Sequence, residues 1–369
     1  MPRVRPRREI CDCLDCADDS SRQVDPTLRS ALARLEPPPK SFIIIIDGAL
    51  IANPSGGNSL ELAQLPHLDS LAREGCNGLL AATVGEHTPP LSCQILQGSA
   101  ANAPPMPQRF KNIHVALVGN CSSLEAIGEG LGSHSTRVLP LNAPQKWPQT
   151  ERLAKELTSC LGVQPLEEYV ASFSLNKPLE DNESDMIILW MQLPEITHRQ
   201  EEEEEDEASS EAIDQACVAL EWTDLLLRSL DSIPGFRDTV LTTLVVTPPP
   251  PTPSLKTDGN SNIPTPRLLQ HPLAQEQIEL DVRTLNSGEK VVLHRPLQSY
   301  QFCGMKQVKV DTERSAVVVH RLPGIVRKDR VEELNVAAIE AKGGGRCILG
   351  ERMLFEIAYK IDKAPKYGA

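Results

Sequence analysis

The chain alternates between short runs that are apolar throughout and longer segments with apolar residues on one side only. Three runs are continuously apolar or nearly so: "FIIIID" (42–47), "DMIILWMQL" (185–193) and "TVLTTLVVT" (239–247). Runs of this kind are typical of strands that are buried on both faces of a parallel sheet. We therefore predict a mostly parallel sheet that contains these three segments.

Segments with the 3.6-residue period of amphipathic helices separate the apolar runs. Further strands are predicted at "HVALVG" and "TRVLPL", and, nearer the C-terminus, at "EKVVLHRP" and "SAVVVHRLPG". Helices are predicted at 66–75, 122–132, 153–161, 213–227, 329–345 and 351–362. Repeated βα units of this kind indicate an α/β fold with a doubly wound sheet, whose ligands lie at the carboxyl ends of the strands.

Composition suggests how the 369 residues are divided. The polar stretch 1–40 ends in "EPPPK" and is predicted to be a disordered arm. The α/β domain is expected over 41–300, with an acidic loop at 200–210 and a proline-rich loop at 248–270. Residues 301–369 are expected to form a C-terminal extension that packs on this domain.

Charge and hydropathy exclude several classes of partner. The net charge is −13, and a run of seven acids at 201–207 accounts for about half of it, so the rest of the chain is only mildly acidic. No basic face indicates nucleic acid, and no apolar stretch approaches the roughly 18 residues of a membrane span. Ten cysteines, mostly in apolar contexts, indicate a reducing compartment. We therefore predict a cytoplasmic protein and leave organellar import open.

The segment "CDCLDC" places Cys11, Cys13 and Cys16 within six residues. Three thiolates can bind a soft metal such as zinc, but a tetrahedral site needs a fourth ligand, and no Cys or His follows nearby. Between a zinc site and a flexible tail, we favour the tail.

Asp47 stands directly after four isoleucines and before Gly48. A buried strand would fix this carboxylate in place, and the glycine would leave room for a ligand such as a cation. The alternative is a loop aspartate that caps the next segment. The dipeptide alone does not decide between the two interpretations.

The residues after Asp47 carry a longer pattern. The segment "SLELAQLPHLDSLAREGCNGLL" (59–80) resembles the start of the archaeal type of cofactor-independent phosphoglycerate mutase, a branch of the alkaline phosphatase superfamily. In that family a strand ending in Asp-Gly is followed by a Pro-x-Leu-Asp-x-Leu-Ala-x-x-Gly stretch. The resemblance implies a three-layer α/β sandwich of the alkaline phosphatase type.

The resemblance also implies a site in which two divalent metals, manganese, magnesium or zinc, hold a phosphoryl group while a hydroxyl attacks it. Asp47 matches the first metal-ligating aspartate. His198 in "PEITHR" and His294 in "VVLHRP" match two histidines of the metal site. Thr88 and Ser92 are the hydroxyls nearest to the nucleophile position.

The chain departs from the family at several ligand positions. Pro194 stands where the family has an aspartate, and Pro249–Pro250, within the four prolines that follow "TLVVT", replace an Asp-His pair. Because a proline side chain offers no metal-binding atom, the two-metal site is expected to be degenerate. Bound metal is then expected to be weak or absent, and Asp47→Asn to affect folding little.

Two main hypotheses follow, and whether the chain is an enzyme stays open between them. In the first, the chain is a catalytically degenerate relative of metal-dependent phosphomutases and phosphohydrolases that binds or scaffolds a phosphorylated small molecule or a protein partner. In the second, it is an active phosphatase or phosphomutase with a single-metal or rearranged site, in which Glu195, Asp258 or His271 replaces a missing ligand. A third hypothesis keeps only the fold, with an unrelated ligand in the same crevice.

Overall fold

The structure is a computed structural model that describes most of the chain from Lys40 onward. The described residues are 40–53, 56–83, 89–97, 104–121, 123–140, 147–163, 183–193, 205–249, 279–284, 290–294, 302–303, 306–307, 315–323, 329, 331–344 and 346–365. The "CDCLDC" segment and almost all of the predicted N-terminal arm lie outside these residues, so both predictions stand as they were made.

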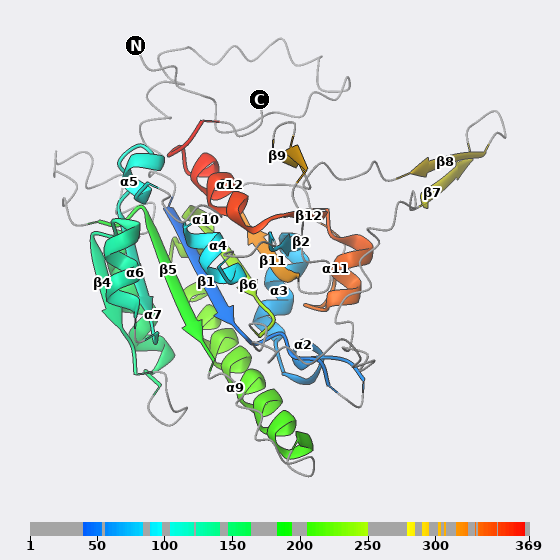
Figure 1. Cartoon of the computed structure of the whole chain (residues 1–369), viewed down its shortest axis with the longest axis horizontal. Coiled ribbons are helices and arrows are strands. Elements are labelled where there is room, and N and C mark those ends of the chain that lie inside the picture. The colour runs from blue at the N-terminus through cyan, green and yellow to red at the C-terminus, as the bar shows by residue number, and fades with distance from the viewer. Residues whose placement is uncertain are drawn as a thin grey trace, which may run out of the picture.

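An eight-stranded sheet forms the centre of the protein (Figure 1). Its strand order is β12-β2-β11-β6-β1-β5-β3-β4. The strands are β1 (Lys40–Asp47), β2 (Cys76–Ala81), β3 (Val115–Gly119), β4 (Ser135–Val138), β5 (Met186–Gln192), β6 (Val240–Val246), β11 (Ala316–Arg321) and β12 (Arg346–Leu349). The three apolar runs of the sequence are β1, β5 and β6, which lie side by side, as their lack of polar residues requires.

The sheet is parallel except at one strand. β1 pairs in parallel with β5 and β6, β3 pairs in parallel with β4 and β5, and β12 pairs in parallel with β2. Only β11 is antiparallel to its two neighbours, β2 and β6. The carboxyl ends of β1, β2, β3, β5 and β6 therefore meet at one edge of the sheet.

Helices cover both faces of the sheet and make three layers (Figure 1). Side chains alternate along β1, so that Ile44 and Ile46 enter one core and Ile43 and Ile45 the other. The first core is covered by α2 (Ser59–Leu62), α3 (Pro66–Glu74), α7 (Thr150–Cys160), α9 (Glu205–Asp231), α10 (Phe236–Thr239) and α11 (Val336–Lys342). The second is covered by α4 (Leu91–Gln97), α5 (Met106–Arg109), α6 (Leu124–Leu131) and α12 (Met353–Lys360). The predicted doubly wound, three-layer α/β fold is confirmed.

The last third of the chain contributes to the main sheet and also forms two small ones. β11 and β12 come from the segment 301–369, which the sequence sets apart as an extension, yet both are strands of the main sheet. β7 (Glu279–Thr284) pairs with β8 (Lys290–His294), and β9 (Phe302–Cys303) with β10 (Lys306–Gln307). Each of these two pairs is a separate two-stranded sheet.

Two predicted boundaries are wrong. The acidic segment expected as a loop over 200–210 is helical from Glu205, because acidic side chains are favourable in the first turn of a helix. The helix expected from Asp329 begins only after Asn335, whose side chain accepts a hydrogen bond from the backbone N–H of Ala338 (3.2 Å). The Asp329 carboxylate instead accepts a hydrogen bond from the backbone N–H of Asn77 in β2 (2.6 Å), and residues 331–335 are not helical.

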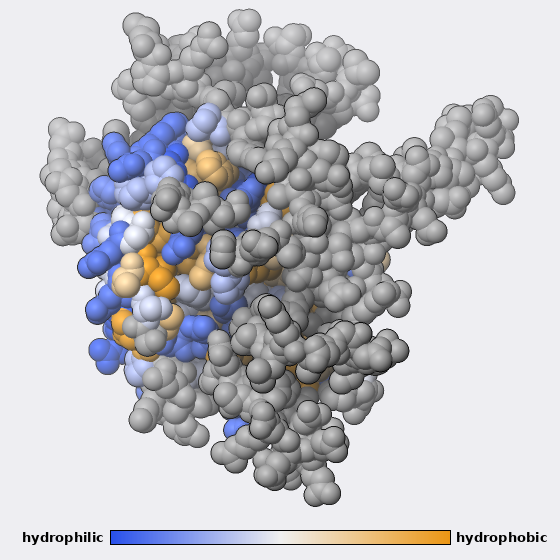
Figure 2. Space-filling model, viewed as in Figure 1, coloured by the Kyte–Doolittle hydropathy of each residue, from blue (hydrophilic) through white to orange (hydrophobic). Residues whose placement is uncertain are grey.

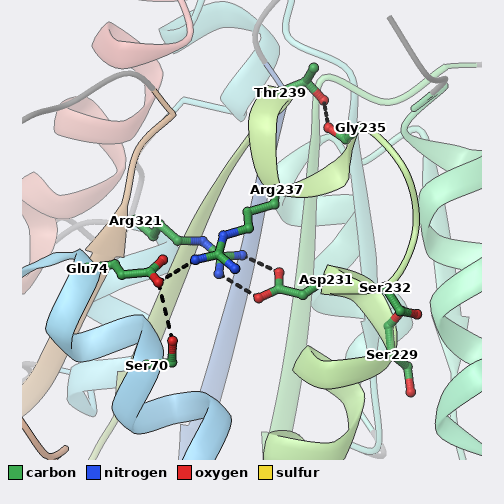
Figure 3. Close-up of polar contacts among 9 residues, drawn as sticks. All are labelled: Ser70, Glu74, Ser229, Asp231, Ser232, Gly235, Arg237, Thr239 and Arg321. Carbon is green, nitrogen blue, oxygen red and sulfur yellow. Dashed lines mark hydrogen bonds and ion pairs between the residues drawn. The ribbon is translucent and has the colours of Figure 1, made fainter.

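Two ion pairs lie at the opposite, amino end of the parallel strands: one joins α9 to β11, and the other joins α10 to α3 (Figure 3). The Arg321 guanidinium, 5% exposed, donates through both terminal nitrogens to the Asp231 carboxylate at the end of α9, and Nη1 lies 2.6 Å from Oδ2. Beside it, Arg237 of α10 pairs with Glu74 at the end of α3. The four residues connect three helices and one strand.

The described surface is largely polar. Figure 2 shows hydrophilic residues along the border of the face that carries β4 and α6, with smaller apolar patches among them. The large apolar side chains exposed within the described residues are Leu62, Val138, Val218 and Leu225. None of the described helices is both long enough and apolar enough to cross a membrane.

Candidate functional site

Asp47 is the last residue of β1 and lies at the carboxyl edge of the sheet, between β5 and β6. The side chain is only 9% exposed. Hydrogen bonds on both sides fix the backbone here: Leu193 N donates to Asp47 O (3.0 Å), and Thr247 N donates to Ile46 O (3.0 Å). Gly48 follows with φ +85°, a left-handed conformation that favours glycine and turns the chain away from the strand.

Two hydroxyl groups bind the Asp47 carboxylate, one at each oxygen. Ser92 Oγ donates to Oδ2 at 2.6 Å, and Thr247 Oγ1 donates to Oδ1 at 2.5 Å. Thr247 Oγ1 in turn accepts from the backbone N–H of Gly48 (3.1 Å). Short O–H···O bonds to a carboxylate are charge-assisted and stronger than those between neutral groups.

The glutamine at the centre of α4 positions this helix, and Ser92 with it. Gln94, 1% exposed, accepts from both Thr83 N (2.8 Å) and Thr83 Oγ1 (2.9 Å). Its amide group donates to Thr83 O (3.1 Å) and to Pro89 O (2.8 Å). One buried side chain therefore joins the residues after β2 to the start of α4.

The thiol beside Ser92 is sensitive to the charge of Asp47. Burial raises the pKa of the Cys93 thiol, and the negative charge of the Asp47 carboxylate raises it further. Cys93 is half-buried. A side-chain hydrogen bond with Ser92 lowers the pKa of this thiol, so Cys93 contacts the same hydroxyl that binds Asp47.

Pro249 lies next to Gly48. A Cβ added to Gly48 would lie 3.9 Å from Cα of Pro249 and 3.8 Å from Cβ of Leu193. The family resemblance implies metal-ligating side chains at Pro249–Pro250. The first of these positions is close to Gly48, the residue that follows Asp47. Pro250 lies outside the described residues.

The structure brings together two of the five site residues predicted from the sequence, Asp47 and Ser92. His294 is the last residue of β8, in the small sheet with β7, where its register partner is Glu279. Thr88 and His198 lie outside the described residues, as do the rescue candidates Glu195, Asp258 and His271. Their predicted roles remain predictions.

The sequence places Thr247, like Asp47, just past the carboxyl end of an apolar strand but gives it no role, and it does not single out Gln94. Thr247 follows the last residue of β6, and its pairing with Asp47 needs β6 to lie beside β1, which the order of elements along the chain does not reveal. Gln94 lies in a seven-residue helix that was not predicted.

The residues around Asp47 can be tested for their fit to a divalent metal. Tight sites for zinc, manganese or magnesium draw on several carboxylate, imidazole or thiolate ligands. Among the described residues, no group of three or more His, Cys, Asp or Glu side chains is placed to hold a metal ion. The polar side chains bonded to Asp47 are neutral hydroxyls, so in the described part of the chain the donor set does not fit the implied two-metal centre.

The fold is a three-layer α/β sandwich that carries this site at the carboxyl edge of a mostly parallel sheet. No family model matches the chain, and no curated protein matches it. Among solved structures, the PH0037 protein from Pyrococcus horikoshii is similar over 90% of this chain and 99% of its own, with 12% identity and a TM-score of 0.50.

Two further solved structures carry the names of enzymes or families. The cofactor-independent phosphoglycerate mutase from Thermoplasma acidophilum has 10% identity and a TM-score of 0.42, covering 86% of this chain and 98% of its own. A protein in the alkaline phosphatase superfamily from Vibrio parahaemolyticus has 13% identity and a TM-score of 0.32, covering 59% and 57%. At these identities the similarity concerns the fold alone.

Proposed function

We propose that this chain is a catalytically degenerate relative of metal-dependent phosphomutases and phosphohydrolases that acts as a binding or scaffolding module. The observation that carries the proposal is the environment of Asp47. Its carboxylate accepts from the hydroxyls of Ser92 and Thr247, and Pro249, at a position where the family supplies a ligand, lies beside the adjacent Gly48.

Phosphoryl transfer at a two-metal site depends on metal charge. The metals neutralise the phosphoryl oxygens and lower the pKa of the attacking hydroxyl. A single carboxylate bonded to two neutral hydroxyls can do neither, because its own negative charge repels a phosphate. Loss of the ligands therefore removes the electrostatic basis of the reaction while leaving the fold intact.

The same electrostatics bears on the partner. Two like charges about 4 Å apart repel by several kcal/mol where water is largely excluded, at an effective dielectric constant near 20. A phosphate group bound against Asp47 without metal would meet this repulsion. Of the two expected partners, a phosphorylated small molecule and a protein, the protein is the better supported.

One observation favours the second hypothesis, an active phosphatase with a rearranged or single-metal site. Ser92 Oγ donates to Asp47 Oδ2 at 2.6 Å, the distance at which a carboxylate can accept a proton from a serine nucleophile. In this alternative, Ser92 or Thr88 attacks the phosphate and His198 and His294 complete the site with Asp47.

Metal content and hydrolysis together decide between the two. The full chain is purified from medium supplemented with manganese, zinc and magnesium, its metals are measured by mass spectrometry, and p-nitrophenyl phosphate is the substrate. If the site is degenerate, the chain holds far less than one equivalent of metal. Any hydrolysis is then the same in the wild type and in Asp47→Asn. The matched control is Asp214→Asn, an exposed acid on α9.

One result would reverse the proposal. Tightly bound metal, with hydrolysis that Asp47→Asn and Ser92→Ala abolish but Asp214→Asn preserves, establishes the second hypothesis.

A further inference from the structure

We infer that Asp47 acts as a metal-independent bridge that holds the N-terminal turn of α4 against the carboxyl ends of β1 and β6. The inference rests on the proposed function, because it gives the retained aspartate a task that needs no metal. Its three members, Asp47, Ser92 and Thr247, come from segments 45 and 200 residues apart in sequence.

Each member of this bridge depends on the other two. Asp47 is 9% exposed and Ser92 and Thr247 are 1% exposed each, so water reaches them little. A buried carboxylate or hydroxyl without a hydrogen-bond partner destabilises the native state. The carboxylate gives both hydroxyls an acceptor, and the hydroxyls give each carboxylate oxygen a donor.

The surrounding backbone fixes the bridge in place. Thr247 donates its N–H to Ile46 O (3.0 Å) and accepts from Leu50 N (2.9 Å), while its hydroxyl accepts from Gly48 N (3.1 Å). Of the two acceptors within reach of the hydroxyl proton, Asp47 Oδ1 at 2.5 Å is much closer than Pro248 O at 3.3 Å, so the hydroxyl donates to Asp47. This orientation occupies lone pairs of the carboxylate that a metal would otherwise use.

The bridge also gives α4 an attachment that the short helix needs. α4 has only seven residues, too few to be stable through its own hydrogen bonds. Gln94 joins it to Thr83 and Pro89, and Ser92 joins it to β1 through Asp47. The position of α4 therefore depends on side chains at the edge of the sheet.

A double-mutant cycle tests the bridge. Urea unfolding is measured with EDTA present for the full chain, Ser92→Ala, Thr247→Val and the double variant. Each single variant leaves Asp47 with one donor, and we expect the unfolding equilibrium constant to rise about tenfold. The double variant leaves the carboxylate with neither donor. Its unfolding equilibrium constant should therefore rise by more than the product of the two single increases.

Control variants separate the bridge from a general loss of buried hydroxyls. Ser229 is a buried serine whose hydroxyl donates to Leu225 O (3.0 Å). Ser229→Ala should combine with Thr247→Val without excess loss. Ser92→Thr, which retains the hydroxyl, should recover most of the stability that Ser92→Ala loses.

The outcomes distinguish failure of the inference from failure of the proposed function. If the increases in the unfolding equilibrium constant simply multiply in EDTA, and manganese has no effect, the inference of a bridge is wrong and the proposal of a degenerate site stands. A rise in melting temperature with manganese that Asp47→Asn abolishes overturns both, because ligand binding to the native state would then run through Asp47. Excess loss in the double variant, the same in EDTA and in manganese, supports the bridge.

Discussion

His320 provides a sharp test of the packing between β11 and α12. It lies opposite Thr243 of β6, and its Nδ1 is 2.9 Å from Thr243 Oγ1. Burial and, to a smaller extent, the charge of Lys360 on α12 together lower its pKa from 6.5 to about 3. The native state therefore keeps this imidazole neutral at pH values where the unfolded chain protonates it.

The sign and size of the effect follow from proton linkage. Below pH 6.5 the unfolded state binds a proton that the native state does not, so stability is complete above 6.5 and is lost as the pH falls toward 3. Between about pH 7.5 and about pH 5 this single group removes about 2 kcal/mol from the free energy of unfolding. His320→Gln, which retains a hydrogen-bonding side chain, should not show this loss.

Urea unfolding of the two proteins at the two pH values measures the difference. The wild type should lose about 2 kcal/mol more than His320→Gln on acidification. Thr243→Val removes the hydrogen bond but leaves the packing around the half-buried His320 in place, so it should keep the pH dependence of the wild type. Equal losses in wild type and His320→Gln would refute the argument, because they would mean that solvent reaches this imidazole.

Three further predictions follow from the packing and the site. Asp231→Ala leaves the buried Arg321 guanidinium without its carboxylate, and urea unfolding should show that the free energy of unfolding falls by about 3–5 kcal/mol. Replacing both residues of the pair by Leu and Met should recover most of this free energy. No recovery would contradict this view of the pair. Ile44→Asp places a charge at a position that is 0% exposed, which costs several kcal/mol against a total stability of roughly 5–15, so the variant should be insoluble; a soluble, folded variant would contradict the buried position. Asp47→Asn should lower the pKa of the Cys93 thiol, because the carboxylate raises it. Alkylation of Cys93 by iodoacetamide, followed by mass spectrometry of its peptide, should therefore show a pH profile with its midpoint at lower pH. An unchanged midpoint would mean that the two groups do not interact.

Strands without polar residues were the most predictable part of the fold. β1, β5 and β6 were predicted because only a strand that is covered on both faces carries so continuous an apolar run. β2 and β12 were missed, since "CNGLLA" and "RCIL" are short and the first contains Asn and Gly. Their burial depends on neighbours that are distant in sequence, which local pattern does not encode.

The candidate site was predictable only in its first residue. Asp47 was found because a carboxylate after a buried strand is conspicuous, and Ser92 because its hydroxyl is near a family position. That the two bond directly, with Thr247 as the second donor, depends on how α4 and β6 are arranged around β1. The sequence expectation that Asp47→Asn affects folding little therefore changes: with the carboxylate buried and twice hydrogen-bonded, a clear loss of stability is expected.

The antiparallel strand β11 has a consequence for how the protein is made. It inserts between β2 and β6, which are complete by residues 81 and 246, but its own residues are 316–321. During synthesis, the nascent chain therefore holds two strands whose pairing edges have no partner until the ribosome has added about seventy more residues. Unpaired edges of apolar strands are sites of aggregation, and contacts this distant in sequence form slowly. A chain stalled near residue 300 should thus depend on chaperones to a degree that the finished protein does not.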